Sequence, residues 1–404
     1  MSDLPLQGIR VLDLGQVYAG PLASRVLADL GAEVIRIESD VRSTRGGRLP
    51  QPGAVYPGGE PGMHPYNRSA YYNELHRNKL AVSLNLSKEK GKDVFMQLAG
   101  ISDVVIENFT PRVMQNFGLE YSVLSKINPQ IIMISISAYG QTGPYRDYVS
   151  FGRGIEAMSG LADITGYPES GPIGPGTAYA DATGGLHGAF AILLALRQRR
   201  RTGNGQYIDL SLQESLISLL GEYVVDYTMN QRKAIRNGNN DGIALFQECF
   251  RCLGDDSWIA IALHSEKEIE ALEGLISRPV DPDDPATLRQ SIGEWTMQHE
   301  PNAAMIMLQQ SGIAAGVVQC PQDLIENEHL HQRGFFQVIE HPEAGAHTYP
   351  GTPWRMGNIQ SQAHRPAPCF AEHNEYVFGT LLGMSKDTIA ELEAEGIAAR
   401  VPLQ

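Results

Sequence analysis

The sequence has no long hydrophobic run. Within its 404 residues we find no apolar stretch that reaches the ~18 residues needed to cross a bilayer. The opening residues, MSDLPLQGIRVLDL, also lack the basic start and apolar core of a secretory signal. We therefore expect no membrane association and no export. A hydrophobic content of 42% with 19% charged residues is typical of a globular chain.

Positive charge is scarce. The chain has 32 Lys and Arg residues against 46 Asp and Glu residues, which gives a formal net charge of -14. Non-specific binding to nucleic acid needs a basic surface that displaces counterions, so nucleic acid is not an expected partner. An acidic protein can still bind a polyanion at a local cluster of cations.

Cysteine is also scarce, with four residues in the chain. Cys249 and Cys252 form a C-x-x-C, but a zinc ribbon needs a second pair at similar spacing, and none is present. The surrounding LFQECFRCLGDDSWIAIAL reads as two strands around a turn, which favours packing over redox chemistry for these thiols. We expect no metal and a reducing, cytoplasmic location.

Several common active-site motifs are missing. G-x-G-x-x-G is absent after the first strand, because Gly15 and Gly20 stand too far apart, and no P-loop, H-E-x-x-H or G-x-S-x-G occurs. Glu38 ends the second strand, where a ribose-binding acid lies in dinucleotide folds. A nicotinamide oxidoreductase remains an alternative on this point alone, although an ordinary strand-end charge explains Glu38 as well.

The first half of the chain alternates strands and helices. GIRVLDL, AEVIRIES, NKLAVSLNL, SDVVIENF and QIIMISISAYG read as strands, with helices at PLASRVLADLG, EKGKDVFMQLAGI, VMQNFG and YSVLSKIN. This alternation predicts an open α/β fold with a largely parallel, Rossmann-like sheet. Sites in such sheets lie beyond the carboxyl ends of the strands, which places residues 16–20, Asn108 and residues 137–141 at the candidate site.

The second half is organised differently. A helix is expected at LHGAFAILLALRQRRR, then a strand and one long helix over YIDLSLQESLISLLGEYVVDYTMNQR. Residues from about 245 to 320 read as a smaller α/β or α+β unit with a hairpin and helices at EKEIEALEGLI and PNAAMIMLQQSG. The remainder reads as loop until a helix at KDTIAELEAEG. We expect a large domain over 1–220 and 326–404 and a small domain over 221–325.

Cations cluster near several strand ends. VRSTRGGR supplies Arg42, Arg45 and Arg48, HRNKLAVSL supplies Arg77 and Lys79, and NFTPR supplies Arg112. Each one alone is best explained as a solvated loop charge. Together they predict a binding site for a phosphorylated ligand.

Asp181 stands alone among small residues in TAYADATGGLHGAF. It can be a helix N-cap, whose carboxylate accepts hydrogen bonds from free N–H groups. It can also be a catalytic carboxylate in a place where glycines allow a ligand to approach closely. The stretch by itself does not decide between the two.

Seven blocks, in order, resemble the family III (CaiB/BaiF-type) coenzyme A transferases, the group that contains formyl-CoA transferase and the carnitine CoA transferase. They are PLQGIRVLDLGQVYAGPLASRVLADLGAEVIRIE, HRNKLAVSLNL, SDVVIENFTPRVMQNFGL, INPQIIMISISAYGQTGPY, YADATGGLHGAFAILLALRQRRRTGNGQYIDLSLQES, GIAAGVVQCPQDLIENEHLHQRGFF and AEHNEYVFGTLLGMSKDTIAELEAEGI. The resemblance covers nearly the whole chain.

The resemblance implies that Asp181 is the nucleophile. Its carboxylate would attack an acyl-CoA thioester, and an aspartyl-CoA thioester would then pass CoA to a free carboxylic acid. CoA would be a substrate, with no tightly bound cofactor. The expected CoA contacts, taken from the strand ends and the matching blocks, are Val17, Tyr18, Ala19, Arg45, Arg77, Lys79, Asn108, Arg112, Ser137, Tyr139 and Gly140.

Two departures bear on the alternatives within this superfamily. The acyl-CoA racemases use a His shortly after G-Q-x-G-P and a Glu in the second domain, and those positions hold Phe151 and Ser265 here, with Glu266 adjacent. Racemisation needs an acid/base pair, so it is the weaker alternative. The RNGNNDGIALFQE segment also lacks the glycine run of formyl-CoA transferases, which argues against oxalate and formate as substrates.

The resemblance further implies an interlocked homodimer of two ring-like chains. A chain that leaves its large domain and returns to it leaves an opening, and in this family the partner chain fills that opening.

Overall fold

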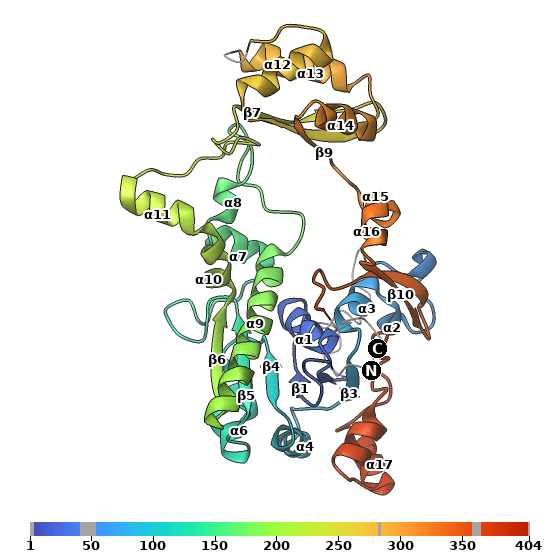
Figure 1. Cartoon of the computed structure of the whole chain (residues 1–404). Coiled ribbons are helices and arrows are strands. Elements are labelled where there is room, and N and C mark those ends of the chain that lie inside the picture. The colour runs from blue at the N-terminus through green and yellow to red at the C-terminus, as the bar shows by residue number, and fades with distance from the viewer. Residues whose placement is uncertain (1–3, 41–53, 282–283, 358–364, 403–404) are drawn as a thin grey trace. The chain divides into compact units, whose positions relative to one another are not determined.

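A computed structural model describes residues 4–40, 54–281, 284–357 and 365–402 (Figure 1). The chain divides into two compact units. The first comprises residues 1–161, 174–226 and 333–404, and the second comprises residues 162–173 and 227–332. The domain boundaries expected from the sequence stay a prediction.

A six-stranded parallel sheet forms the centre of the first unit. Its strands are β1 (Arg10–Asp13), β2 (Glu33–Glu38), β3 (Leu80–Ser83), β4 (Val104–Glu107), β5 (Ile132–Ser137) and β6 (Gln206–Ser211). They lie in the order β3-β2-β1-β4-β5-β6, which confirms the expected Rossmann-like α/β fold. The strand order reverses between β1 and β4, where open α/β sheets form their ligand-binding crevice.

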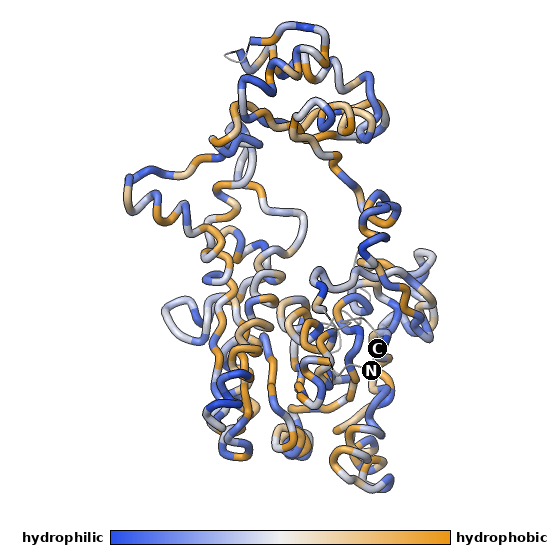
Figure 2. The backbone as a smooth tube through the Cα atoms, in the orientation of Figure 1, coloured by the Kyte–Doolittle hydropathy of each residue, from blue (hydrophilic) through white to orange (hydrophobic). Residues whose placement is uncertain are grey.

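Apolar side chains fill both faces of this sheet. Neighbouring residues point to opposite faces, so Val11 and Leu12 belong to separate hydrophobic clusters. One face is covered by α1 (Ala19–Asp29) and α9 (Tyr179–Thr202), and the other by α4 (Glu89–Gly100), α6 (Tyr121–Ile127), the π-helical segment η4 (Glu375–Leu381) and α17 (Lys386–Ala394). Burial on both faces explains why the strands read as continuous apolar runs, mostly orange in Figure 2.

Shorter elements complete the first unit. They are η2 (Pro57–Gly59), α2 (Pro65–Arg68), α3 (Ala70–His76), α5 (Arg112–Phe117), α7 (Gly152–Met158), α10 (Leu212–Ile217), η3 (Ser218–Leu220) and the antiparallel hairpin of β10 (Phe336–His341) and β11 (Gly345–Pro350). The hairpin was expected to be loop. The one long helix expected after β6 is instead broken into α10, η3 and α11 (Gly221–Asn230), so that expectation was wrong.

The second unit packs helices on a three-stranded antiparallel sheet of order β7-β8-β9. Its elements are β7 (Phe246–Arg251), β8 (Trp258–Leu263), β9 (Ala314–Val317), α12 (Glu266–Ile276), α13 (Pro285–Thr296) and α14 (Pro301–Gln310), with α15 (Pro321–Glu326) and α16 (Glu328–Gln332) following and α8 (Leu161–Ile164) at its start. The expected hairpin is present. Cys252 lies in the core, Cys249 is partly buried, and the four cysteines are free thiols.

Helix α9 carries Asp181 and packs in the core of the first unit. Among the described helices, it is long and apolar enough by composition to cross a membrane, but half of its apolar window is buried, and it packs on α1 and β5 as a core helix. The packing depends on glycine. A Cβ at Gly184 would lie 2.0 Å from Leu212 Cδ2, and one at Gly185 would lie 2.8 Å from the carbonyl oxygen of Ala19. These glycines therefore bring helices together rather than making room for a ligand.

Candidate functional site

A pocket of about 560 Å³ lies at the carboxyl edge of the parallel sheet, within the first unit. Loops that follow β1, β2, β3, β4 and β5 line it, together with Asp181 on α9 and Leu212 on α10. Its volume is in the range of sites for cofactor-sized ligands. Of the expected contacts, Val17, Asn108, Ser137 and Asp181 lie in the lining.

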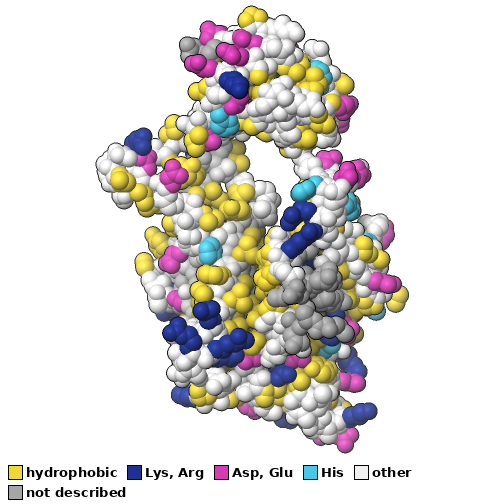
Figure 3. All heavy atoms as spheres, in the orientation of Figure 1, with side chains coloured by type: hydrophobic (Ala, Val, Ile, Leu, Met, Phe, Trp, Pro, Cys, Tyr) yellow, Lys and Arg dark blue, Asp and Glu magenta, His cyan; other side chains and the backbone are white. Residues whose placement is uncertain are grey.

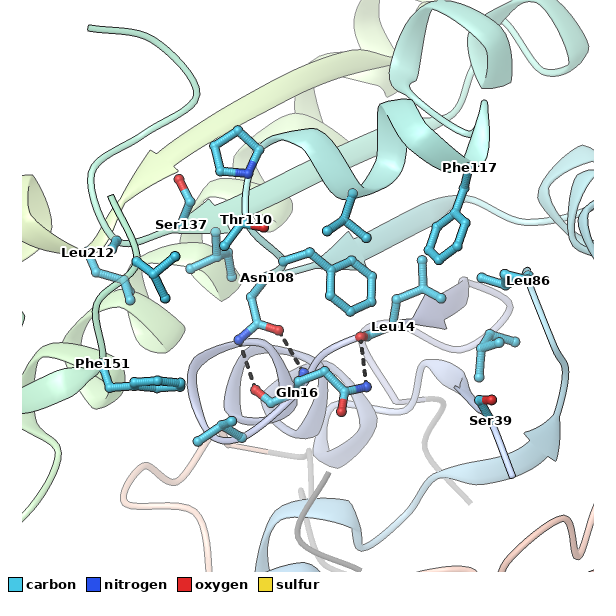
Figure 4. A pocket seen from close by; sticks show the side chains of 18 of the residues that line it. Leu14, Gln16, Ser39, Leu86, Asn108, Thr110, Phe117, Ser137, Phe151 and Leu212 are labelled. Atoms are coloured by element: carbon cyan, nitrogen blue, oxygen red, sulfur yellow. Dashed lines mark hydrogen bonds between the residues drawn. The ribbon is translucent and has the colours of Figure 1, made fainter. Parts of the chain in front are cut away.

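The loop after β1 is held in an unusual conformation. Asn108 clamps it, because its Oδ1 accepts from Gln16 N–H at 2.6 Å and its Nδ2 donates to the Gln16 carbonyl at 2.8 Å (Figure 4). Val17 has φ of 59°, which is rare for a β-branched residue, and the Tyr71 hydroxyl donates to its carbonyl at 2.9 Å. Such strain persists only where surrounding contacts fix it, and it is frequent at ligand sites.

Two glycines make this clamp possible. A Cβ at Gly15 would lie 2.7 Å from Asp13 Oδ1, and one at Gly20 would lie 2.9 Å from the Gly15 Cα. The sequence correctly placed this loop at the strand end. The spacing of Gly15 and Gly20 serves close backbone packing and not a dinucleotide fingerprint.

Lys79 does not reach the pocket. Its side chain is fully buried, and Nζ lies 3.0 Å from Asp13 Oδ2, 2.7 Å from Ser24 Oγ and 3.1 Å from His76 Nδ1. Burial lowers the pKa of Lys79 to about 8, while the charge of Asp13 opposes that shift. The expectation that Lys79 offers a free charge to a phosphate was wrong, because this charge is already paired beneath the site loop.

The charge of Arg77 is also paired inside the protein. Its guanidinium pairs with Asp29 at 2.8 Å and donates to the Pro350 carbonyl at 2.6 Å, with about 2% of the residue exposed. It therefore ties α3 to α1 and to the β10–β11 hairpin. The expected role of Arg77 as a phosphate contact is not supported by this placement.

The exposed cations lie elsewhere. Arg112 is exposed and makes a two-point ion pair with Asp147, at 3.1 Å and 2.8 Å, outside the pocket lining. Arg146, which we did not single out from the sequence, does line the pocket. It follows the GQTGPY stretch and not a strand, which is why a search of strand ends missed it. Arg45 lies outside the described residues.

The other expected contacts surround the pocket without lining it. Tyr18 caps the start of α1, and Ala19 is buried in the first turn. Tyr139 packs edge-on against Tyr145 and Tyr148, with ring centroids 6.0 and 6.3 Å apart, and Tyr148 itself lines the pocket. Gly140 turns the chain with φ of 85°. Glu38 lines the pocket and pairs with Arg36 at 2.8 Å, so an ion pair explains it without a ribose.

Asp181 is the third residue of α9, half-buried in the pocket wall. The N-cap alternative was wrong, because Ala178 occupies the cap position. Burial, together with the charge of Glu156, raises the pKa of Asp181 to about 6. Its carboxylate is thus basic for an aspartate yet mostly ionised at neutral pH, as a nucleophile requires.

The racemase alternative lacks its histidine in this pocket. Phe151, in the position of the racemase His, lines the pocket with an exposed ring, and it cannot transfer a proton. Ser265 and Glu266 belong to the second unit, where Ser265 caps α12. Within the described parts of the chain, no three His, Cys, Asp or Glu side chains are grouped to hold a metal ion.

Comparisons with known proteins agree with this geometry. The model of "CoA-transferase family III" matches residues 6–374. The chain is 30% identical to a succinyl-CoA–D-citramalate CoA-transferase of Chloroflexus aurantiacus, over 97% of this chain and 98% of that protein. It is 29% identical to the human succinyl-CoA:glutarate CoA-transferase, over 97% of this chain and 90% of that protein.

A solved structure shows the same fold. The crystal structure of a CaiB/BaiF family protein from Brucella suis superposes with a TM-score of 0.84 at 28% identity, covering 94% of this chain and all of that one. The family model matches most of the chain, and the relatives match over nearly their full length. This chain therefore belongs to the family III CoA-transferases.

Proposed function

We propose that the protein moves CoA from an acyl-CoA thioester to a free carboxylic acid, with Asp181 as the covalent nucleophile. The observation that carries the proposal is the position of this carboxylate: it stands in the wall of the pocket, in the first turn of α9, with a pKa raised to about 6. The first turn of a helix favours the ionised form, and the raised pKa strengthens it as a base and nucleophile.

The exchange then takes four steps. An Asp181 oxygen attacks the thioester carbonyl, the C–S bond breaks, and a mixed anhydride and CoA thiolate form. The thiolate attacks the aspartyl carbonyl and releases the donor carboxylate, which leaves an aspartyl-CoA thioester. The acceptor carboxylate attacks this thioester and expels the thiolate. Attack of the thiolate on the acceptor carbonyl gives the new acyl-CoA and restores the Asp181 carboxylate.

The names of the relatives narrow the substrates. Succinyl-CoA is the donor in the names of the Chloroflexus and human relatives, with D-citramalate and glutarate as acceptors. We propose a dicarboxylic acyl-CoA donor and a dicarboxylic acceptor for this chain. CoA acts as a substrate rather than a resident cofactor. Arg146, the cation among the described lining residues, is then the candidate partner for a substrate anion.

Mass spectrometry tests the covalent step. Protein incubated with succinyl-CoA is digested at low pH, and the peptide that carries Asp181 is expected to gain the mass of CoA. Asp181→Asn keeps the shape but not the charge, and should lose both the adduct and transfer activity by several orders of magnitude. Asp387→Asn, an exposed acid in the first turn of α17, is the matched control and should keep both. Near-normal turnover by Asp181→Asn would refute the assignment.

We further propose a homodimer of interlocked chains, in the cytoplasm. The first unit supports the assembly with an exposed apolar stripe on α9, where Leu186 is 51%, Phe190 60% and Leu194 51% exposed, spaced one turn apart. Exposed apolar residues continue at Leu219 and Tyr223. Hydrophobic side chains gather over this part of the molecule in Figure 3. Exposed apolar residues spaced along one side of a helix are typical of a protein interface.

A further inference from the structure

Helix α7 packs against the start of α9, next to the carboxylate of Asp181. Gly152 and Glu156 are four residues apart on this helix and so lie on one face, which meets the start of α9. A Cβ at Gly152 would lie 2.6 Å from Asp181 Oδ2, so a larger residue would force the Asp181 carboxylate to move. One turn further on, Glu156 Oε1 accepts the N–H of Tyr179, the first residue of α9, at 2.9 Å.

The Glu156 contact supports a helix start that has no side-chain cap. Ala178 at the N-cap has no side-chain oxygen, and the Tyr179 N–H is shared between the Thr177 carbonyl, at 2.9 Å, and Glu156 on another helix. Glu156 is 1% exposed, and its second oxygen, Oε2, has no hydrogen-bond partner. An unpartnered buried oxygen is costly, and a glutamine would satisfy the same N–H without a charge. Capping alone therefore does not account for a carboxylate here.

We propose that Glu156 is a positioning residue for the nucleophile: its carboxylate fixes the first turn of α9 against α7 and keeps a negative charge beside Asp181. The charge makes the Asp181 carboxylate a stronger base and nucleophile than its burial alone would. This inference rests on the proposed function, since it assigns a partner to the same nucleophile.

The groups that face Asp181 support an electrostatic role. Glu156 acts from α7, Tyr18 from the start of α1 and Tyr71 from α3. Burial raises the pKa of both tyrosines, so they stay neutral while Asp181 titrates. Arg146 lines the same pocket but is not among the causes of the Asp181 shift. Glu156 is thus the charge that acts on the ionisation of Asp181, adding to the effect of burial.

Two variants separate the contact from the charge. Glu156→Gln keeps an oxygen for the Tyr179 N–H but removes the charge. Glu156→Asp keeps the charge, but its side chain is one methylene shorter and cannot keep the contact. Glu89→Gln, at the exposed start of α4, is the matched control. The pH dependence of kcat/KM and kcat with succinyl-CoA and a dicarboxylate acceptor is measured for all of them. Titration of the substrates is common to every variant, so differences report on the protein.

Glu156→Gln is expected to move the acid limb of the kcat/KM profile down by roughly half a pH unit or more, and to lower kcat at pH 8 about three- to tenfold. Glu156→Asp should keep the wild-type limb and lose kcat through the looser first turn of α9. An acid limb that is unchanged in Glu156→Gln overturns the electrostatic role, and an unchanged kcat in Glu156→Asp overturns the positioning role. If Glu156→Gln does not fold, Glu156→Asp carries the test: an unchanged kcat overturns the positioning role, and an acid limb that moves although the charge is kept overturns the electrostatic role.

Failure of the inference can be told from failure of the proposed function. An adduct on the Asp181 peptide together with an unmoved acid limb in Glu156→Gln rejects Glu156 and leaves the nucleophile intact. Full activity of Asp181→Asn rejects the nucleophile, and the inference with it.

Discussion

The pKa of Asp181 has a consequence for stability that is separate from catalysis. The ordinary pKa of 3.8 is raised to about 6 in the folded protein. Between pH 4 and 6, the folded state therefore holds a proton that the unfolded state releases. The ionised carboxylate destabilises the fold increasingly as pH rises through this window, and fully above it. Asp181→Asn removes the charge and should stabilise the protein at neutral pH while it abolishes transfer.

The size of the effect follows from the shift. Two pH units at about 1.4 kcal/mol each give a limit of ~3 kcal/mol. Because the Asp181 side chain is half-buried at a pocket wall that water reaches, we expect about half of this limit in practice. For a chain of this length, such a gain raises Tm by roughly 1–2 °C.

Thermal unfolding of both proteins from pH 4 to pH 8 is the assay. The Tm difference between Asp181→Asn and wild type should be near zero at pH 4 and should grow to its full size by pH 7. The pH dependence is the decisive readout, because any packing change made by the amide is the same at every pH. Asp387→Asn, also in the first turn of a helix but exposed, should show no such growth. A Tm difference that does not vary with pH would refute the reasoning.

Two further predictions concern cations and assembly. Lys79→Met should destabilise the fold by about 3–5 kcal/mol, because it leaves Asp13 charged and buried, whereas Arg146→Ala should raise the apparent KM for acyl-CoA with little change in Tm. Chemical denaturation and steady-state kinetics on both variants check the pair, and the opposite pattern would return the ligand-binding role to Lys79. Analytical ultracentrifugation down to nanomolar concentration should find only dimer, and a folded, active monomer would contradict the interlocked assembly.

Local patterns in the sequence determined most of the large sheet. Strands buried on both faces read as short apolar runs, and the helices between them carry one apolar face, so the α/β alternation was visible before any contact was known. Gly31, expected to end the first helix, indeed has φ of 100° just after α1. The loop after β1 and Asn108 lie at the pocket as expected from the sequence, because parallel strands bring their carboxyl ends to one edge. Asp181, which the family blocks mark, lines the same pocket.

Two features of the fold were not predicted from the sequence, because the local residue pattern there is weak. The β10–β11 hairpin has only partly buried strands, so its alternation is faint. The break between α10 and α11 falls at Ser218 and Gly221, within a stretch whose other residues are mostly apolar and compatible with one helix. Neither feature can be read from periodicity. In both cases the conformation depends on contacts with residues far away in the chain.

Only the tertiary structure decided whether each charged side chain is buried in an ion pair or exposed. Arg77, Lys79 and Arg112 look alike in sequence, near strand ends, but the first two are buried in ion pairs and the third is paired at the surface. Glu156 could not be singled out from the sequence, because its contact is with a helix start 23 residues away. The free energy of a charge depends on its burial and on the charges and donors around it. The fold sets those surroundings, and they cannot be read from neighbours in the chain.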